Sequence, residues 1–239
     1  EETYVYDMST RERTLRKRQD IPSGHDPSAY VVRRIMATGH DGVQIPVTVL
    51  YREGTPLDGS APLMLYGYGS YGITIPAAFR VTPLSLVDRG MIYAVAHIRG
   101  GMANGYQWYL DGKLEGKINT FRDFLSAGNA LVEDGFTTRG NIVAYGGSAG
   151  GLLVGAAINM EPDLFAGAIA AVPFVDVLNT MSDESLPLTP PEWPEWGNPL
   201  TSETDYDTIL AYSPYDQVGD KDYPAMLITG GLSDPRVTY

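Results

Sequence analysis

A serine flanked by glycines stands where the sequence changes from strand-like to helix-like. Ser148 lies within the run Gly146 to Gly150, with the apolar segment 142–145 before it and the small-residue segment 152–158 after it. In this context G-x-S-x-G predicts a sharp turn that exposes the serine hydroxyl above a parallel sheet. Glycines suit such a turn because it leaves no room for Cβ atoms. The motif favours nucleophilic chemistry by Ser148 over a glycine-rich turn with an idle serine.

An activated serine needs a base, an orienting carboxylate and hydrogen-bond donors for an oxyanion. In sheet proteins with this motif, the acid and then the histidine follow the serine along the chain. Asp234 fits the place of the acid because it lies in the loop after the apolar run 225–229. Other aspartates follow less clear strands: Asp176, Asp183, Asp216, Asp220 and Asp222.

The histidines do not fit this order. His25, His40 and His97 all precede Ser148. His25 lies in a segment rich in breakers and His40 at a hairpin turn, so we expect both to be solvated. His97 ends a buried strand, where we expect a hydrogen-bonded structural histidine. The base is therefore expected outside these residues.

Composition narrows the class of protein. A length of 239 residues suits one sizeable α/β domain with a short appendage. The net charge of −12 argues against non-specific binding to nucleic acid. No apolar run approaches the ~20 residues that cross a bilayer, and the chain does not open on a signal peptide, so no membrane partner is expected. The absence of cysteine excludes disulfides and a thiol nucleophile.

The order of expected elements predicts how Ser148 is positioned. An antiparallel hairpin over 30–37 and 43–51 precedes alternating strands and helices, and several runs lack polar alternation, as in parallel strands covered on both faces. This predicts an α/β class with an α/β-hydrolase sheet, mostly parallel with helices on both faces. Further strands are expected at 3–8, 13–18, 62–68, 91–98, 142–145, 166–172 and 225–229. Helices are expected at 79–88, 152–158 and from a cap at Asn119 or Thr120 to Glu133.

Two segments stand outside this alternation. Residues 20–28 are rich in breakers and are expected to be a linker. Residues 182–201 contain five prolines and two tryptophans. An excursion of that length is expected to carry function or a cap.

Seven runs of this sequence resemble one known family: LYGYGSYG (65–72), IRGG (98–101), NTFRDF (119–124), GGSAGGLL (146–153), VPFVDV (172–177), EWGNP (195–199) and DPRV (234–237). They are similar to the prolyl oligopeptidase family of serine peptidases, and within it to the oligopeptidase B branch. The resemblance implies a β-propeller followed by an α/β-hydrolase domain. Residues 1–28 would then be the end of the propeller and a linker. Residues 29–239 would be the catalytic domain, lacking its C-terminal part with the catalytic histidine.

The resemblance also implies roles for residues of the site. Ser148 would be the nucleophile and Asp234 the acid of the triad. The backbone N–H of Ala149 and the hydroxyl of Tyr68 would hold the oxyanion. From the residues alone, the favoured explanation of Tyr68 is a turn aromatic that packs on the sheet.

Three further positions match substrate-binding residues of the family. Glu192 would hold an arginine or lysine before the scissile bond, Arg236 would bind the peptide backbone, and Tyr71 would line the same site. A buried ion pair with a nearby acid is the alternative for Arg236. The expected partners are short basic peptides and the propeller of the parent protein. The expected location is the cytoplasm. Neither a cofactor nor a metal is expected.

The sequence departs from the oligopeptidase B pattern at several acidic positions. Pro194 replaces a second acid near Glu192, Pro76 and Ala78 replace two aspartates, and Ala103 replaces a glutamate. A preference for two consecutive basic residues is therefore not expected. Three functions stay open: a serine oligopeptidase cleaving after Arg or Lys, an esterase or aminopeptidase of the same family, and a non-catalytic fragment or binding scaffold.

Overall fold

The structure, a computed structural model, describes residues 1–22, 24–76 and 78–237. The strands are β1 (Glu2–Tyr6), β2 (Arg13–Arg18), β3 (Tyr30–Thr38), β4 (Gln44–Arg52), β5 (Leu63–Tyr66), β6 (Ile92–Ala96), β7 (Ile142–Gly147), β8 (Phe165–Ala171) and β9 (Ala225–Thr229). The α-helices are α1 (Leu84–Val87), α2 (Tyr106–Leu110), α3 (Ile118–Glu133), α4 (Ala149–Met160), α5 (Val177–Met181), α6 (Thr189–Trp196) and α7 (Glu203–Leu210). Short 3-10 turns are η1 (Pro27–Ala29), η2 (Leu114–Gly116) and η3 (Pro162–Leu164).

Seven of the strands form one sheet in the order β3-β4-β6-β5-β7-β8-β9. β3 pairs antiparallel with β4, and β4 with β6. All the following pairs are parallel. The carboxyl ends of β5, β7, β8 and β9 therefore lie at one edge of the sheet, and the loops that leave them meet there. This arrangement confirms the predicted α/β class with an opening hairpin.

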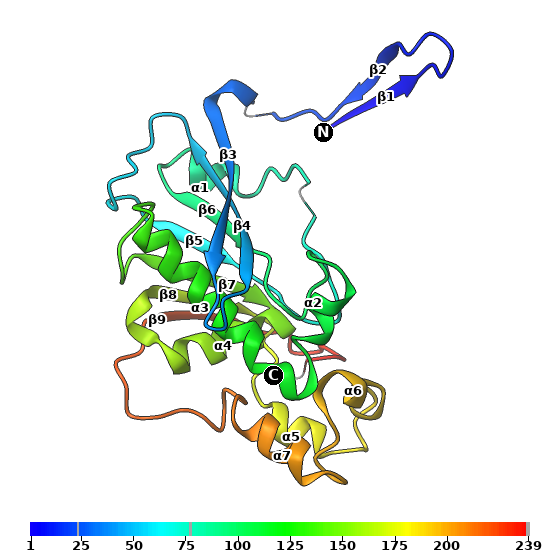
Figure 1. Ribbon diagram of the computed structural model, residues 1–239, viewed down its shortest axis with the longest axis vertical. Helices are drawn as coiled ribbons and strands as arrows, with labels where there is room; N and C mark the ends of the chain where they lie inside the picture. The colour runs from blue at the N-terminus through cyan, green and yellow to red at the C-terminus, as the bar shows by residue number, and fades with distance from the viewer. Residues whose placement is uncertain (23, 77, 238–239) are drawn as a thin grey trace.

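The core lies between the sheet and two long helices. Fully buried residues alternate with half-buried ones along β6 and β7, so one face of the sheet is covered more completely than the other. α3 and α4 lie side by side (Figure 1) and pack against the strands, with Phe121, Phe124 and Leu131 of α3 fully buried. The helix predicted to end at Glu133 is thus confirmed, with an apolar side that packs against the strands.

The edge strand β9 is apolar in sequence but is not covered on both faces. All five of its residues are exposed, and its apolar side chains Met226, Leu227 and Ile228 are 53%, 57% and 61% accessible. β9 is held by its ladder with β8, and among the described residues no helix covers it. Its apolar sequence predicts a strand correctly, but burial depends on elements packed against it.

Two predicted helix boundaries are wrong. The helix expected over 79–88 is only α1, because Pro83 fixes the start of a single turn. Neither Asn119 nor Thr120 caps α3, which begins one residue after Lys117. The Asn119 amide donates to the Asp111 carbonyl, and the Thr120 hydroxyl lies 3.0 Å from the Arg99 carbonyl. Both polar side chains therefore bind neighbouring loops instead of the helix end.

Two segments stand at the periphery of the sheet. The hairpin β1–β2 projects away from the rest of the chain (Figure 1), and every residue in it is exposed. The excursion 182–201 contains α6, which packs on α5 at the opposite end of the molecule, and α5 packs in turn on α7. No helix of the described residues is long and apolar enough to cross a membrane.

A buried ion pair fastens α3 to the loop after β6. Asp123 is completely buried, and its carboxylate accepts from the Arg99 backbone N–H and from both Nε and Nη2 of the guanidinium, at 2.6 to 3.0 Å. Asp41, on the turn between β3 and β4, pairs with the same guanidinium from a more exposed position. Three distant parts of the chain thus converge on Arg99.

We expect Asp123→Ala to lower the free energy of unfolding by about 3–5 kcal/mol, because it removes one partner from a buried ion pair. Urea unfolding measures the loss. The matched change Asp163→Ala removes an exposed partner of Arg139, which keeps Glu161, and should leave the midpoint nearly unchanged. Equal midpoints for the two variants would contradict the prediction.

Candidate active site

Ser148 occupies a strained turn between β7 and α4. Its φ of 58° and ψ of −121° lie in a region that residues with a Cβ rarely adopt. The turn is tightly packed: a Cβ on Gly146 would lie 2.1 Å from the Gly150 carbonyl oxygen, and one on Gly151 would lie 2.5 Å from Pro173. The glycines of the motif are therefore required by space, and the predicted sharp turn between strand and helix is confirmed, with Ser148 half-exposed.

Tyr68 follows β5, the strand next to β7, and faces the serine. A Cβ on Gly150 would lie 3.3 Å from the Tyr68 ring. Burial raises the pKa of Tyr68, while the neighbouring Ser148 side chain acts in the opposite direction. The phenol therefore keeps its proton at neutral pH and is a donor beside the serine. Ala149 begins α4, so its N–H is one of the amide groups that a helix start leaves free.

Asp234 lies in the loop after β9, at the same edge of the sheet as Ser148. One carboxylate oxygen accepts from the backbone N–H groups of Val237 and Arg236, at 3.0 and 2.9 Å. These hydrogen bonds lower the pKa of Asp234, so the group is ionised at neutral pH. The Arg236 side chain is exposed and forms no ion pair within the described residues. The alternative of a buried ion pair for Arg236 is therefore wrong.

None of the histidines is hydrogen-bonded to Ser148 or Asp234 in the part of the chain that the structure describes. His97 is buried and shares a hydrogen bond of 2.8 Å with the Thr48 hydroxyl, as expected of a structural histidine. His40 is exposed on its turn. His25, expected to be solvated, is instead half-buried and stacks on Tyr30. The aromatic neighbours of His25 come from distant positions, which local sequence does not reveal.

Glu192 and Tyr71 are brought together from positions 121 residues apart. The Tyr71 hydroxyl and the Trp196 indole N–H both donate to Glu192 Oε2, each at 2.8 Å. Burial and the Glu192 carboxylate both raise the pKa of Tyr71, which therefore stays a donor. Both donors are neutral, and no cation pairs with Glu192 among the described residues. The site thus holds a half-buried carboxylate with an uncompensated charge.

Two buried charged residues that the sequence did not single out lie beside this cluster. Glu195 accepts from the backbone N–H of Tyr71 at 2.7 Å and from the hydroxyl of Tyr109 at 2.6 Å. Lys117 donates to the carbonyl of Gly69 at 2.6 Å. Nothing in their local sequence marks either residue, because their partners are far along the chain.

A hollow in the described residues lies away from Ser148. A cavity of about 330 Å³ lies over β4 and β6 and is lined by apolar side chains, with His25 and His97 among them. Pro76 and Ala78, which stand where the resemblance places aspartates, also line it. Neither Ser148 nor Asp234 does. Within the described residues, no group of three or more side chains has the composition of a metal site.

Comparison with known proteins identifies the family of this chain. A sequence profile described as "Prolyl oligopeptidase family" matches residues 77–239. The chain belongs to the prolyl oligopeptidase family. It is 49% identical over 238 residues to a protein named dipeptidyl aminopeptidase BI from Pseudoxanthomonas mexicana. It is 46% identical over 237 residues to protease 2 from Moraxella lacunata. Each alignment covers 99% of this chain.

Solved structures of the family have the same fold. Oligopeptidase B from Leishmania major superposes with a TM-score of 0.95 at 46% identity, covering 100% of this chain. Oligopeptidase B from Trypanosoma brucei, in a closed form with covalently bound antipain, gives 0.94 at 48% identity over 98% of this chain. The chain spans about a third of the length of these proteins. The predicted prolyl oligopeptidase family and α/β-hydrolase fold are confirmed.

We expect His97 of this family member to stay neutral down to about pH 5, because burial lowers its pKa to about 4. Between the unfolded value of about 6.5 and 4, the folded protein then binds fewer protons than the unfolded chain, so stability falls as the pH falls through this window. An NMR titration of labelled histidine measures the midpoint, with His97→Gln assigning the resonance. A midpoint near 6.5 would contradict the prediction.

Proposed function

We propose that these residues form the catalytic core of a serine oligopeptidase that hydrolyses short peptides after Arg or Lys. The observation that carries the proposal is the strained turn at Ser148 with the protonated Tyr68 hydroxyl against it. A strained, half-exposed serine beside fixed donors fits nucleophilic catalysis better than structure, since the strain costs stability and needs compensation.

In the proposed mechanism Ser148 Oγ bonds to the scissile carbonyl carbon and gives its proton to a base. The carbonyl electron pair moves onto oxygen, which accepts hydrogen bonds from the Tyr68 hydroxyl and the Ala149 N–H. When the intermediate collapses, the C–N bond breaks and the base protonates the leaving amine. Water then attacks the ester by the same route and releases a carboxylic acid and free Ser148.

The base is proposed to be a histidine outside these residues. Asp234 would orient its imidazole: the carboxylate is ionised, and only one oxygen is used by the backbone of its own loop. The first 28 residues are proposed to be the end of a β-propeller and a linker. Their exposed hairpin packs on nothing else in the described residues, which suits a strand pair that belongs to a separate domain.

Glu192 is proposed to select the basic side chain. Its carboxylate is held by Tyr71 and Trp196 but is not neutralised. A guanidinium or ammonium entering the site would supply the missing charge through a charge-assisted hydrogen bond. Oligopeptidase B from Trypanosoma brucei, which is 48% identical to this chain, holds covalently bound antipain, and this supports a covalently reactive site in this chain.

A second candidate, an aminopeptidase releasing dipeptides, is favoured by one comparison. The protein named dipeptidyl aminopeptidase BI is 49% identical to this chain. Peptides with free and acetylated amino termini separate the two functions. An oligopeptidase cleaves both after Arg, whereas an aminopeptidase releasing dipeptides requires the free amine.

The test of the function uses the full-length polypeptide and an Arg-containing fluorogenic peptide. Ser148→Ala should reduce kcat by roughly 10⁶, the cost of losing a triad nucleophile. Tyr68→Phe should reduce kcat by about 10²–10³ because it deletes one oxyanion donor. Hydrolysis that survives Ser148→Ala would overturn the proposal, and unaltered folding of both variants is checked by circular dichroism.

Specificity is tested with Glu192→Gln. We expect kcat/KM for an Arg peptide to fall roughly 10–100-fold, the range for a hydrogen bond to a charged group, while the neutral citrulline analogue is little affected. Glu184→Gln, an exposed change in the same excursion, is the matched control. Equal losses on both peptides, or a preference for proline, would contradict the role of Glu192.

A further inference from the structure

Lys117 is a basic side chain buried at a position unfavourable for positive charge. It is 1% accessible and stands at the N-terminus of α3, where the helix dipole disfavours positive charge. Burial lowers its pKa to about 7, with the nearby Glu195 carboxylate acting in the opposite direction. No ion pair to a carboxylate holds it within the described residues. Such a residue destabilises the fold unless its contacts compensate.

Its compensating contacts are acceptors from two loops. The Nζ atom donates to the Gly69 carbonyl at 2.6 Å, the Ser70 hydroxyl at 2.9 Å and the Gly112 carbonyl at 3.3 Å. An ammonium group has three N–H donors, so each acceptor receives one. The ammonium also lies 5.1 Å from the centre of the Trp196 ring. Lys117 therefore touches the turn that carries Tyr68 and the helix α6 that carries Glu192.

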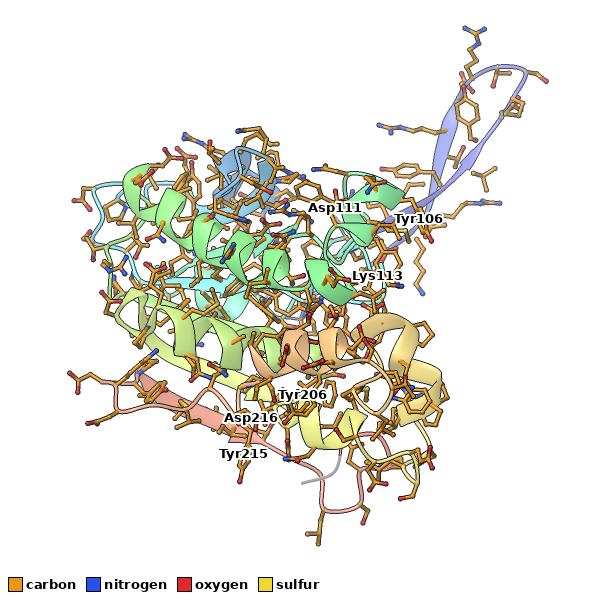
Figure 2. The ribbon with its side chains drawn as sticks, turned by 60° about the horizontal axis from the view of Figure 1, so that its bottom comes forward. Tyr106, Asp111, Lys113, Tyr206, Tyr215 and Asp216 are labelled. Atoms are coloured by element: carbon orange, nitrogen blue, oxygen red, sulfur yellow. The ribbon has the colours of Figure 1, made fainter. Side chains whose placement is uncertain are left out.

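Glu195 binds the same turn through the backbone of Tyr71. Tyr71 has a φ of 57°, and its N–H donates to Glu195 Oε1. The second carboxylate oxygen accepts from Tyr109, whose hydroxyl in turn accepts from Lys113 at 3.0 Å. Figure 2 shows Lys113 directly above α6 and α7, where η2 packs on both helices. The turn 68–72 is thus held by Lys117 at the start of α3 and by Glu195 on α6.

We propose that Lys117 is a positioning residue, which acts with Glu195 to hold the turn 68–72 so that the Tyr68 hydroxyl meets the oxyanion. This inference rests on the proposed function. Lys117 binds Gly69 and Ser70, and Glu195 binds the next residue, Tyr71. Tyr68 directly precedes these three residues in the chain. Loss of the Lys117 side chain removes its hydrogen bond to the Gly69 carbonyl, next to Tyr68. The contacts of Ser148 and Glu192 do not involve Lys117 and are kept.

The consequence is a loss in the chemical step with little change in substrate binding. A donor displaced by about 1 Å costs roughly 10²-fold in rate. Lys117→Met, which keeps the length of the side chain and removes the donors, should therefore lower kcat by roughly 10²-fold with KM within about twofold. Ser70→Ala removes one acceptor only and should lower kcat by a smaller factor.

The experiment uses the full-length enzyme and two inhibitors. A peptide aldehyde ending in Arg forms a tetrahedral adduct whose oxyanion needs Tyr68, and the matching peptide alcohol does not. We expect Lys117→Met to weaken aldehyde binding by the same factor as kcat and to leave alcohol binding unchanged. Lys221→Met is the matched control: this exposed lysine also donates to a backbone carbonyl, that of Asn159, and its loss should change neither quantity.

Each outcome separates the inference from the function on which it rests. Equal weakening of both inhibitors means a general structural role and overturns the proposal, as does an unchanged kcat in Lys117→Met. If Lys117→Met does not fold, Ser70→Ala decides by the same pair of inhibitors. A wild-type enzyme without Ser148-dependent hydrolysis overturns the proposed function itself, whereas an active wild type with unaltered variants overturns only the role of Lys117.

Discussion

The Gly69 carbonyl oxygen is the point on which the loops of the candidate site converge. A Cβ on Gly100 would lie 2.0 Å from it, so the loop after β6 approaches the loop after β5 at backbone contact. The same oxygen accepts a hydrogen bond of 2.6 Å from Lys117. Backbone turns packed this closely direct their carbonyl groups inward, where each buried acceptor needs a donor. The start of α3 supplies these donors through Lys117 and Thr120.

Buried charged side chains fix loops of the site to helices in two places of the structure. The Arg99–Asp123 pair fixes the loop after β6 to α3, and Lys117 with Glu195 fixes the loop after β5 between α3 and α6. Burying charge costs free energy, and the cost is offset only where hydrogen bonds satisfy the groups. The site therefore depends on networks that fail when one partner is removed, which suits a site whose donors must not move.

The edge strand β9 shows that a strand can be paired in the sheet without being buried. β9 pairs in register with β8, yet its apolar side chains stay accessible within the described residues. The loop that follows carries Asp234, held by two backbone hydrogen bonds of its own. The conformation of this loop is therefore stabilised by hydrogen bonds within the loop itself. Its proposed use as the acid of a triad requires a histidine, because none of the described histidines is hydrogen-bonded to Asp234.

The sequence by itself determined the strands of the main sheet and the turn that carries the proposed nucleophile. Apolar runs predicted the strands of the main sheet, and the spacing of glycines about Ser148 predicted the turn, because both depend on contacts within a few residues. The tertiary structure alone decided the rest. Asn119 and Thr120 are good caps that bind neighbouring loops instead, His25 is stacked on Tyr30, and Glu195 and Lys117 meet the Tyr68 turn from elsewhere. Such contacts join residues far apart in the chain, and no local pattern encodes which distant carbonyl or ring a side chain will meet.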